Sequence, residues 1–262
     1  MSTRAHAVSD SATMLRRNLR HALRYPSMSV SIVAMPVIFL LLFVYVFGGT
    51  LGAGLGGAPG GGRYIDYVVP GIIVLTAATG SMSTAVSVCV DMTEGIVARF
   101  RTMAIFRPSL LTGHVAGSMI QAMLSMGLVI SAALLMGFRP TADPARWIAV
   151  IGVLAMLTLA LTWLAVALGL VAKNPETASN LPLPLMLLPF LGSGFVPTNS
   201  MSGGVRWFAE NQPFTPIIET LRGLLTGTAI GHNAVLAVAW CAGITLAGYL
   251  WARAAFNRGP VR

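Results

Sequence analysis

The sequence predicts an all-α integral membrane protein. Of its 262 residues, 55% are hydrophobic and only 10% are charged, and the mean hydropathy is +0.77, well above that of soluble domains. Several apolar runs reach the roughly 20 residues that a helix needs to cross a bilayer. The net charge of +9 is spread over the segments between these runs. We therefore interpret the basic residues as membrane orientation signals and expect no nucleic-acid partner.

Six membrane-spanning helices are expected. Their predicted ranges are 27–47, 67–90, 112–138, 147–172, 181–196 and 234–254. A basic amphipathic segment at 11–25 is predicted to lie on the lipid headgroups ahead of the first span. The fifth span is the least regular, because it contains three prolines and two glycines: Pro182, Pro184, Pro189, Gly192 and Gly194. These prolines either interrupt a helix at a functional site or simply begin it, and the pattern leaves both interpretations open.

An element at 203–225, before the last span, is predicted to be re-entrant. Its two apolar pieces are each too short to cross a bilayer, since a helix over 217–225 would be only about 14 Å long. Glu219 and Arg222 would be costly at the bilayer centre unless paired, and their spacing permits pairing. We expect the element to act as an outer gate with these residues: Asn211, Pro213, Pro216, Glu219 and Arg222.

The longest charged interruption between spans is the segment 91–107. Acidic residues at its start and arginines towards its end match a helix dipole, while Ile96, Phe100 and Met103 form an apolar face. The segment is predicted to be a short helix. It either docks into a partner or lies on the headgroups, and spacing alone does not separate these alternatives.

Small and hydroxyl residues form a stripe on the second predicted span. Such a stripe is more often a helix-packing surface, with the lining of a translocation pathway as the alternative. Gln121 on the third span has the same two interpretations, an interhelical hydrogen bond or a substrate contact. The candidate pathway residues are Thr76, Thr79, Ser83, Ser87 and Gln121.

Basic residues predict the orientation of the chain in a plasma (inner) membrane. With six spans, both termini lie on one side, and twelve arginines and lysines share that side: Arg4, Arg16, Arg17, Arg20, Arg24, Arg99, Arg101, Arg107, Lys173, Arg253, Arg258 and Arg262. The opposite side has five: Arg63, Arg139, Arg146, Arg206 and Arg222. Because basic loops stay inside, we expect both termini to be cytoplasmic.

No catalytic, cofactor or metal site is predicted in this chain. Cys89 and Cys241 lie inside apolar runs, and the four histidines share no metal-ligand or nucleophile spacing. The glycine-rich segment 48–62 lacks the lysine of a phosphate-binding loop, since Lys173 is the only lysine in the chain. The common metalloprotease and serine-hydrolase motifs do not occur either, which argues against a membrane enzyme.

Two motifs make the chain resemble the permeases of type-2 ATP-binding-cassette (ABC) transporters. Asp91-Met-Thr-Glu94-Gly95, followed by Arg99-Phe100-Arg101 and Pro108, resembles the D-x-x-x-G…R coupling segment of that family. Asn211-Gln212-Pro213 with Leu221-Arg222-Gly223 resembles its N-x-P…L-R signature before the final span. The chain length and the NQP variant are similar to those of the daunorubicin-resistance-type drug permeases.

The resemblance implies a transport subunit without ATP-binding residues of its own. Two copies of a separate ATPase, which would bind ATP and Mg²⁺, are expected to contact a coupling helix containing Asp91, Glu94, Gly95, Arg99, Phe100 and Arg101. A second permease, identical or related, is expected to complete a pathway walled by spans one, two and five. The implied cargo is a hydrophobic or amphipathic compound, with polysaccharide or lipid export as alternatives. An ion-coupled transporter would need an acid inside a span, and the predicted spans contain none.

Overall fold

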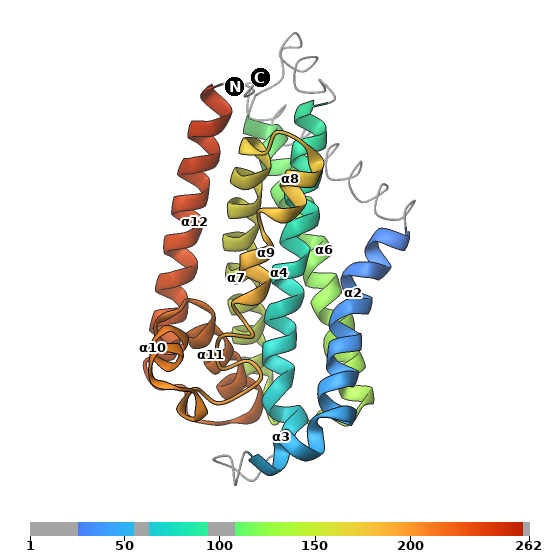
Figure 1. Cartoon of the computed structure of the whole chain (residues 1–262), viewed down its shortest axis with the longest axis vertical. Coiled ribbons are helices and arrows are strands. Elements are labelled where there is room, and N and C mark those ends of the chain that lie inside the picture. The colour runs from blue at the N-terminus through green and yellow to red at the C-terminus, as the bar shows by residue number, and fades with distance from the viewer. Residues whose placement is uncertain (1–25, 55–62, 94–107, 259–262) are drawn as a thin grey trace.

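The computed structural model describes residues 26–54, 63–93 and 108–258 as a bundle of helices (Figure 1). Within these ranges there is no β-strand. The elements in chain order are α2 (Pro26–Leu41), the π-helical η1 (Leu42–Val46), α3 (Gly48–Gly54), α4 (Tyr64–Thr93), α6 (Pro108–Leu135), α7 (Pro144–Val171), α8 (Pro175–Asn180), α9 (Leu183–Leu187), the 3₁₀-helical η2 (Thr198–Ser200), α10 (Gly203–Asn211), α11 (Phe214–Thr226) and α12 (Asn233–Arg258). The predicted all-α class is confirmed.

Four helices of the described residues are long and apolar enough to cross a membrane by length and composition. They are Tyr64–Thr93, Val115–Leu135, Pro144–Val171 and Asn233–Asn257, and a shorter apolar stretch covers Val33–Val46. The outer faces of these helices expose large apolar side chains, such as Leu135 at 90% and Val235 at 72%. Such faces suit a lipid environment and not water. The chain is therefore an integral membrane protein.

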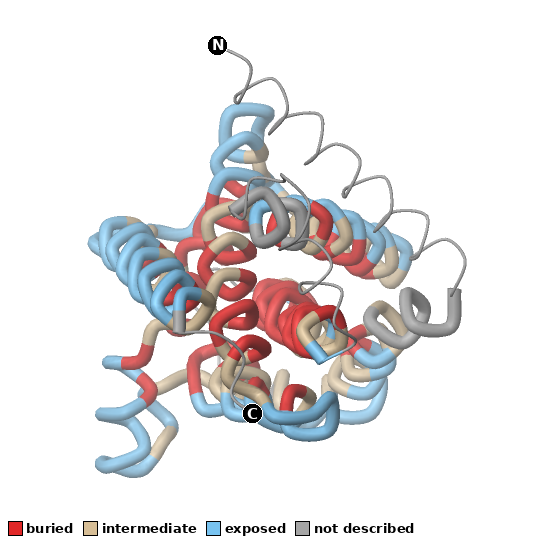
Figure 2. The backbone as a smooth tube through the Cα atoms, turned by 90° about the horizontal axis from the view of Figure 1, so that it is seen from above, coloured by how far each residue is buried: buried red, intermediate tan, exposed pale blue. Residues whose placement is uncertain are grey.

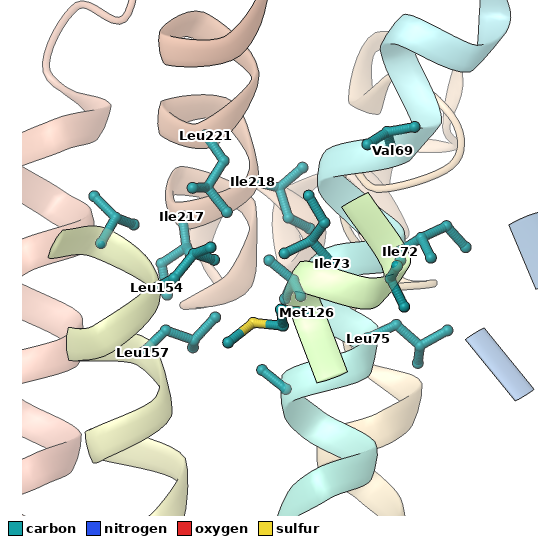
Figure 3. Packing of buried hydrophobic residues seen from close by; sticks show 14 of the residues in the cluster. Val69, Ile72, Ile73, Leu75, Met126, Leu154, Leu157, Ile217, Ile218 and Leu221 are labelled. Carbon is teal, nitrogen blue, oxygen red and sulfur yellow. The ribbon is translucent and has the colours of Figure 1, made fainter. Parts of the chain in front are cut away.

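Helix α4 is the centre of the bundle. It packs against α2, α6, α7, α8 and α11, and its middle turns are fully buried (Figure 2). Apolar side chains from four helices meet around it in the main core (Figure 3): Ile72, Ile73 and Leu75 from α4, Met126 from α6, Leu154 and Leu157 from α7, and Ile217, Ile218 and Leu221 from α11. The short helix α11 thus contributes to the same core as the long helices.

Two glycines allow long helices to approach closely. A Cβ on Gly169 of α7 would lie 2.5 Å from the carbonyl oxygen of Ala85 on α4. A Cβ on Gly248 of α12 would lie 2.8 Å from the backbone nitrogen of Leu164 on α7. Small residues let backbones approach each other, which is how membrane helices gain packing without a hydrophobic driving force. These contacts connect α12 to α7 and α7 to the central α4.

The observed helices differ most from expectation at the fifth predicted span. Helices α4, α6, α7 and α12 lie within a few residues of the predicted second, third, fourth and sixth spans, and α2 with η1 covers most of the first. The range 181–196 was predicted as an irregular span, with an interrupted helix and a proline-initiated helix both left open; the structure has the interrupted form, in which only α9 is helical and residues 188–196 form turns and a bend. Proline has no N–H for helical hydrogen bonding, so Pro184 and Pro189 favour this break. We call residues 188–196 the turn segment.

The two ends of the bundle carry different elements. Helices α3, α10 and α11 lie at one end, and α8 lies towards the other with the last turns of α4 and α12 (Figure 1). The predicted headgroup helix at 11–25 and the segment 94–107 lie outside the described residues.

Candidate functional site

The candidate site is built around α11, a short helix embedded in the bundle. It begins at Phe214 and ends at Thr226, and the next residue, Gly227, has a φ of 78°, the left-handed conformation that favours glycine at a helix C-terminus. Pro216 lies in its first turn, where a backbone N–H has no helical acceptor to lose. From Phe214 to Leu225 every residue is buried except Glu219, which is half-buried. The protein therefore surrounds a helix that is too short to span.

Arg222 of α11 is the most highly connected polar side chain of this site. Its guanidinium donates to the carbonyl oxygen of Tyr67 through Nε at 3.3 Å and Nη2 at 3.1 Å. Nη2 also donates to the carbonyl oxygen of Ser193 at 2.7 Å. Nη1 donates to the Glu219 carboxylate at 2.6 Å, and the guanidinium carbon lies 3.7 Å from the centre of the Tyr67 ring. Arg222 thus joins α11 to the first turns of α4 and to the turn segment.

A guanidinium suits this position because it offers five donors in a fixed plane and also stacks on aromatic rings. Only 7% of Arg222 is exposed, so its charge depends on these partners. The carbonyl of Ser193 belongs to non-helical backbone, which is tolerated at membrane depth only when protein or water satisfies it. Arg222 satisfies that carbonyl and is itself neutralised by Glu219.

A second polar cluster lies where the turn segment meets the start of α11. Gln212 donates through Nε2 to the carbonyl oxygen of Leu188 at 2.9 Å, and Thr215 Oγ1 donates to that of Ala209 at 2.5 Å. The backbone N–H of Ser193 points to Thr215 Oγ1 at 3.4 Å. Gly192 leaves space for this cluster, since a Cβ at that position would lie 2.2 Å from Gln212 Nε2 and 2.8 Å from Thr215 Oγ1 and would displace these side chains. Side-chain hydrogen bonds therefore satisfy some of the backbone groups of the turn segment, alongside its own turn hydrogen bonds.

The turn segment also touches α4 and η1 directly. A Cβ on Gly71 of α4 would lie 2.5 Å from the carbonyl oxygen of Gly194, so the two backbones meet without side chains between them. Phe190 and Phe195 stack at 4.4 Å, and Phe43 of η1 lies 4.5 Å from Phe195. The site consequently holds together α4, η1, the turn segment and α11.

Comparison with known proteins identifies the architecture. The family described as ABC-2 type transporter matches residues 11–226. The chain belongs to this family. It is 29% identical over 228 residues to the daunorubicin resistance ABC transporter permease protein DrrB1 of Streptomyces coeruleorubidus, covering 86% of this chain and 78% of that protein. It is 24% identical over 177 residues to the probable doxorubicin resistance permease DrrC of Mycobacterium tuberculosis, covering 68% and 64%. The predicted family and its drug-resistance subgroup are confirmed.

In this ABC-2 permease, the predicted gate residues fall into two groups. Pro216, Glu219 and Arg222 lie on α11, with Arg222 at the centre of the network. Asn211 is the last residue of α10, is exposed, and donates to the carbonyl oxygen of Trp207 at 2.8 Å. Pro213 is half-buried at the boundary between the two helices. Their assignment as a gate stays a prediction.

Three of the predicted pathway residues of the ABC-2 permease use their hydroxyls for hydrogen bonds within one helix. The hydroxyls of Thr76, Thr79 and Ser83 each donate to a carbonyl oxygen of α4 itself. Thr76 is fully buried, Ser87 is exposed, and Gln121 is half-buried on α6. Burial by neighbouring helices favours a packing role for Thr76, and the interpretation of the other four stays open.

Of the predicted coupling residues, only Asp91 belongs to the described part of the chain. It is buried in the last turn of α4. Near it, the thiol of Cys89 contacts the carbonyl oxygen of Ala172 at 3.7 Å, which brings the end of α4 against the start of the α7–α8 connection. Glu94, Gly95, Arg99, Phe100 and Arg101 lie outside the described residues.

Four residues of the site were not predicted from the sequence: Tyr67, Ser193, Gln212 and Thr215. Gln212 lies inside the Asn-Gln-Pro motif, so the motif was a usable signal for it. Tyr67 and Ser193 contribute backbone carbonyls, which side-chain type does not reveal, and they lie 155 and 29 residues from Arg222.

Proposed function

We propose that this chain is the membrane subunit of an ABC exporter that moves a hydrophobic or amphipathic compound out of the cell. A separate ATPase, present in two copies, binds ATP and Mg²⁺ and drives the transport. Three observations support the proposal: membership of the ABC-2 family, relatives named for daunorubicin and doxorubicin resistance, and a sequence without a phosphate-binding loop.

The observation that carries the transport proposal is the buried Arg222 network. A continuous apolar helix would be the cheapest way to fill this part of the bundle, yet the chain places turns, a buried charge and a short helix here. Interrupted helices of this kind form binding sites and gates in transporters, because their free backbone groups need a cavity or protein partners. We infer that α11 and the turn segment form the outer gate of the pathway.

One six-span subunit would be half of such a pathway. A second permease, identical or related, completes it in our proposal, with α2, α4 and the turn segment forming the walls. Exposed apolar side chains on α2 and η1 provide a surface on which a second permease could pack, among them Met35 at 54%, Ile38 at 56% and Tyr45 at 68% exposure. ATP-driven closure of the two ATPases would shift the permeases between inward-open and outward-open states.

Reconstitution tests this proposal directly. We expect the chain to co-purify with a separate ABC ATPase when the two are expressed together, and daunorubicin to raise ATP hydrolysis in proteoliposomes containing both. If a polysaccharide or lipid stimulates hydrolysis and daunorubicin does not, the drug class is wrong while the exporter proposal stands. Accumulation driven by a proton or sodium gradient without ATP would overturn the exporter proposal.

A variant of the coupling segment supplies the matched test of ATPase contact. Glu94→Lys reverses the charge of a residue in the predicted coupling helix. We expect normal membrane insertion but weaker ATPase association and lower stimulated turnover, and Glu176→Lys, in the exposed α8, is the control for a general charge effect. If Glu94→Lys leaves ATPase association and stimulated turnover unchanged, the segment 91–107 is not a coupling helix, and the alternative of a helix lying on the headgroups is favoured.

A further inference from the structure

Helices α10 and α11 follow each other directly but differ completely in burial. In α11 nearly every side chain is covered, whereas Ala209 is the one buried residue of α10. Three large apolar side chains of α10 are open: Val205 is 46% exposed, Phe208 41% and Trp207 68%. Of the predicted re-entrant element at 203–225, therefore, only α11 enters the bundle, and α10 stays on its surface.

The order of residues gives α10 four distinct sides. At 3.6 residues per turn, Val205 and Phe208 share one flank, and Arg206 and Glu210 share the opposite flank. Arg206 Nε donates to Glu210 Oε1 at 2.8 Å, with both side chains about half exposed. Trp207 lies on the side opposite the buried Ala209. The helix thus has a protein side, an apolar flank, a charged flank and an outward tryptophan.

The position of α10 matches this pattern. It lies at the end of the bundle with α11 and α3, beside the level where α12 begins (Figure 1). The first turns of α12 expose Val235 at 72%, Leu236 at 41% and Val238 at 46%, so lipid-facing surface starts at this end of the bundle. A helix at such a boundary meets hydrocarbon on one flank and water on the other.

We propose that α10 is an interfacial anchor that lies in the headgroup region of the adjoining leaflet. Val205 and Phe208 enter the acyl-chain boundary, the Arg206–Glu210 pair faces water, and the Trp207 indole occupies the headgroup level that this amphipathic ring prefers. The anchor is connected to the site, because Thr215 of α11 donates to the carbonyl oxygen of Ala209 on α10. The membrane surface thereby fixes the height of α11 in the bundle, whatever compound is transported.

Spin labels on the two flanks of α10 test the anchor. Phe208→Cys and its matched control Arg206→Cys are labelled with a nitroxide in the full-length protein, reconstituted in phosphatidylcholine–phosphatidylglycerol vesicles. The native Cys89 and Cys241 are 0% and 2% exposed, and the parent chain treated with the same nitroxide reagent gives the background. We expect collision with oxygen, relative to collision with a water-soluble nickel chelate, to be several-fold higher at 208 than at 206.

Two results would overturn the proposal. If both positions collide mainly with the nickel chelate, α10 is an ordinary outer loop helix in water. If both positions are shielded from oxygen and nickel alike, protein covers the helix, with a second copy of the chain as the occupant. Val205→Cys repeats the measurement on the apolar flank should Phe208→Cys reduce the yield of folded protein.

Discussion

Arg222 is stable inside an apolar bundle because each of its three guanidinium nitrogens donates to an oxygen. Leaving a buried charge network with one partner missing costs about 3–5 kcal/mol, whereas an exposed ion pair contributes at most about 1 kcal/mol. The described residues include pairs of both kinds, among them Arg222–Glu219 in the bundle and Arg206–Glu210 on the exposed α10. The two pairs can therefore be compared within one protein.

The first prediction concerns these two arginines. We expect Arg222→Gln to lower the free energy of unfolding by about 3 kcal/mol, because the carbonyls of Tyr67 and Ser193 lose their charged donor. Arg206→Gln should change it by less than about 1 kcal/mol. Arg222→Lys should recover only part of the loss, since an ammonium lacks the planar set of donors. Thermal unfolding in detergent measures all three; equal effects at 222 and 206 would contradict the network.

At the scale of elements, the turn segment depends on backbone contact with α4. Gly71→Ala would force its Cβ against the carbonyl of Gly194, a backbone atom that cannot rotate away. At Gly80, elsewhere on α4, an added Cβ would lie 3.9 Å from the Ala122 side chain, an ordinary contact. We expect Gly71→Ala to impair transport and lower stability, and Gly80→Ala to do neither. Transport in proteoliposomes and thermal unfolding check this, and a neutral Gly71→Ala would refute the close contact.

Helix α12 offers a similar comparison within one helix. Gly248 packs on the backbone of α7, while a Cβ at Gly243 would meet no atom within 4 Å. We expect Gly248→Ala to destabilise the protein by roughly 1–3 kcal/mol through overpacking, and Gly243→Ala to be neutral or to stabilise it by up to about 1 kcal/mol through helix propensity. Denaturation in detergent separates the two variants. Equal melting temperatures would show that α12 is free to shift away from α7.

These elements also show where sequence reasoning succeeds. Long apolar runs identify α4, α6, α7 and α12 because length and hydropathy are local properties. The turn segment is different, because its prolines favour an interrupted helix but do not reveal what stabilises it. The stabilising contacts come from Arg222, which is 29 residues from Ser193, and from Gly71 on α4. Likewise, α10 and α11 are both short and partly apolar, so only their tertiary contacts separate the buried helix from the exposed one. Pairing of Glu219 with Arg222 was predictable because it lies within one helix turn.

At the scale of the whole molecule, the sequence predicts that basic residues are unequally divided between the two sides of the membrane. On the side that holds α10 and α11, four arginines have an acidic partner within 4.0 Å. Arg206 and Arg222 lie on these two helices, and Arg63 and Arg146 lie near the starts of α4 and α7. The opposite side is assigned twelve of the chain's seventeen basic residues if the N-terminus is inside. Because arginines and lysines are retained in the cytoplasm, this asymmetry predicts that the α8 end is cytoplasmic.

Labelling of exposed positions at both ends tests that orientation. Thr228, after α11, and Thr177, in α8, are exposed residues of the same type at opposite ends of the bundle. With a membrane-impermeant maleimide on intact cells, we expect Thr228→Cys to react and Thr177→Cys to react only after permeabilisation. Gly57→Cys and Arg99→Cys, in the loops between spans, should behave like Thr228→Cys and Thr177→Cys respectively. The reverse pattern would place both termini outside and, with them, the segment 91–107, which could then no longer contact a cytoplasmic ATPase.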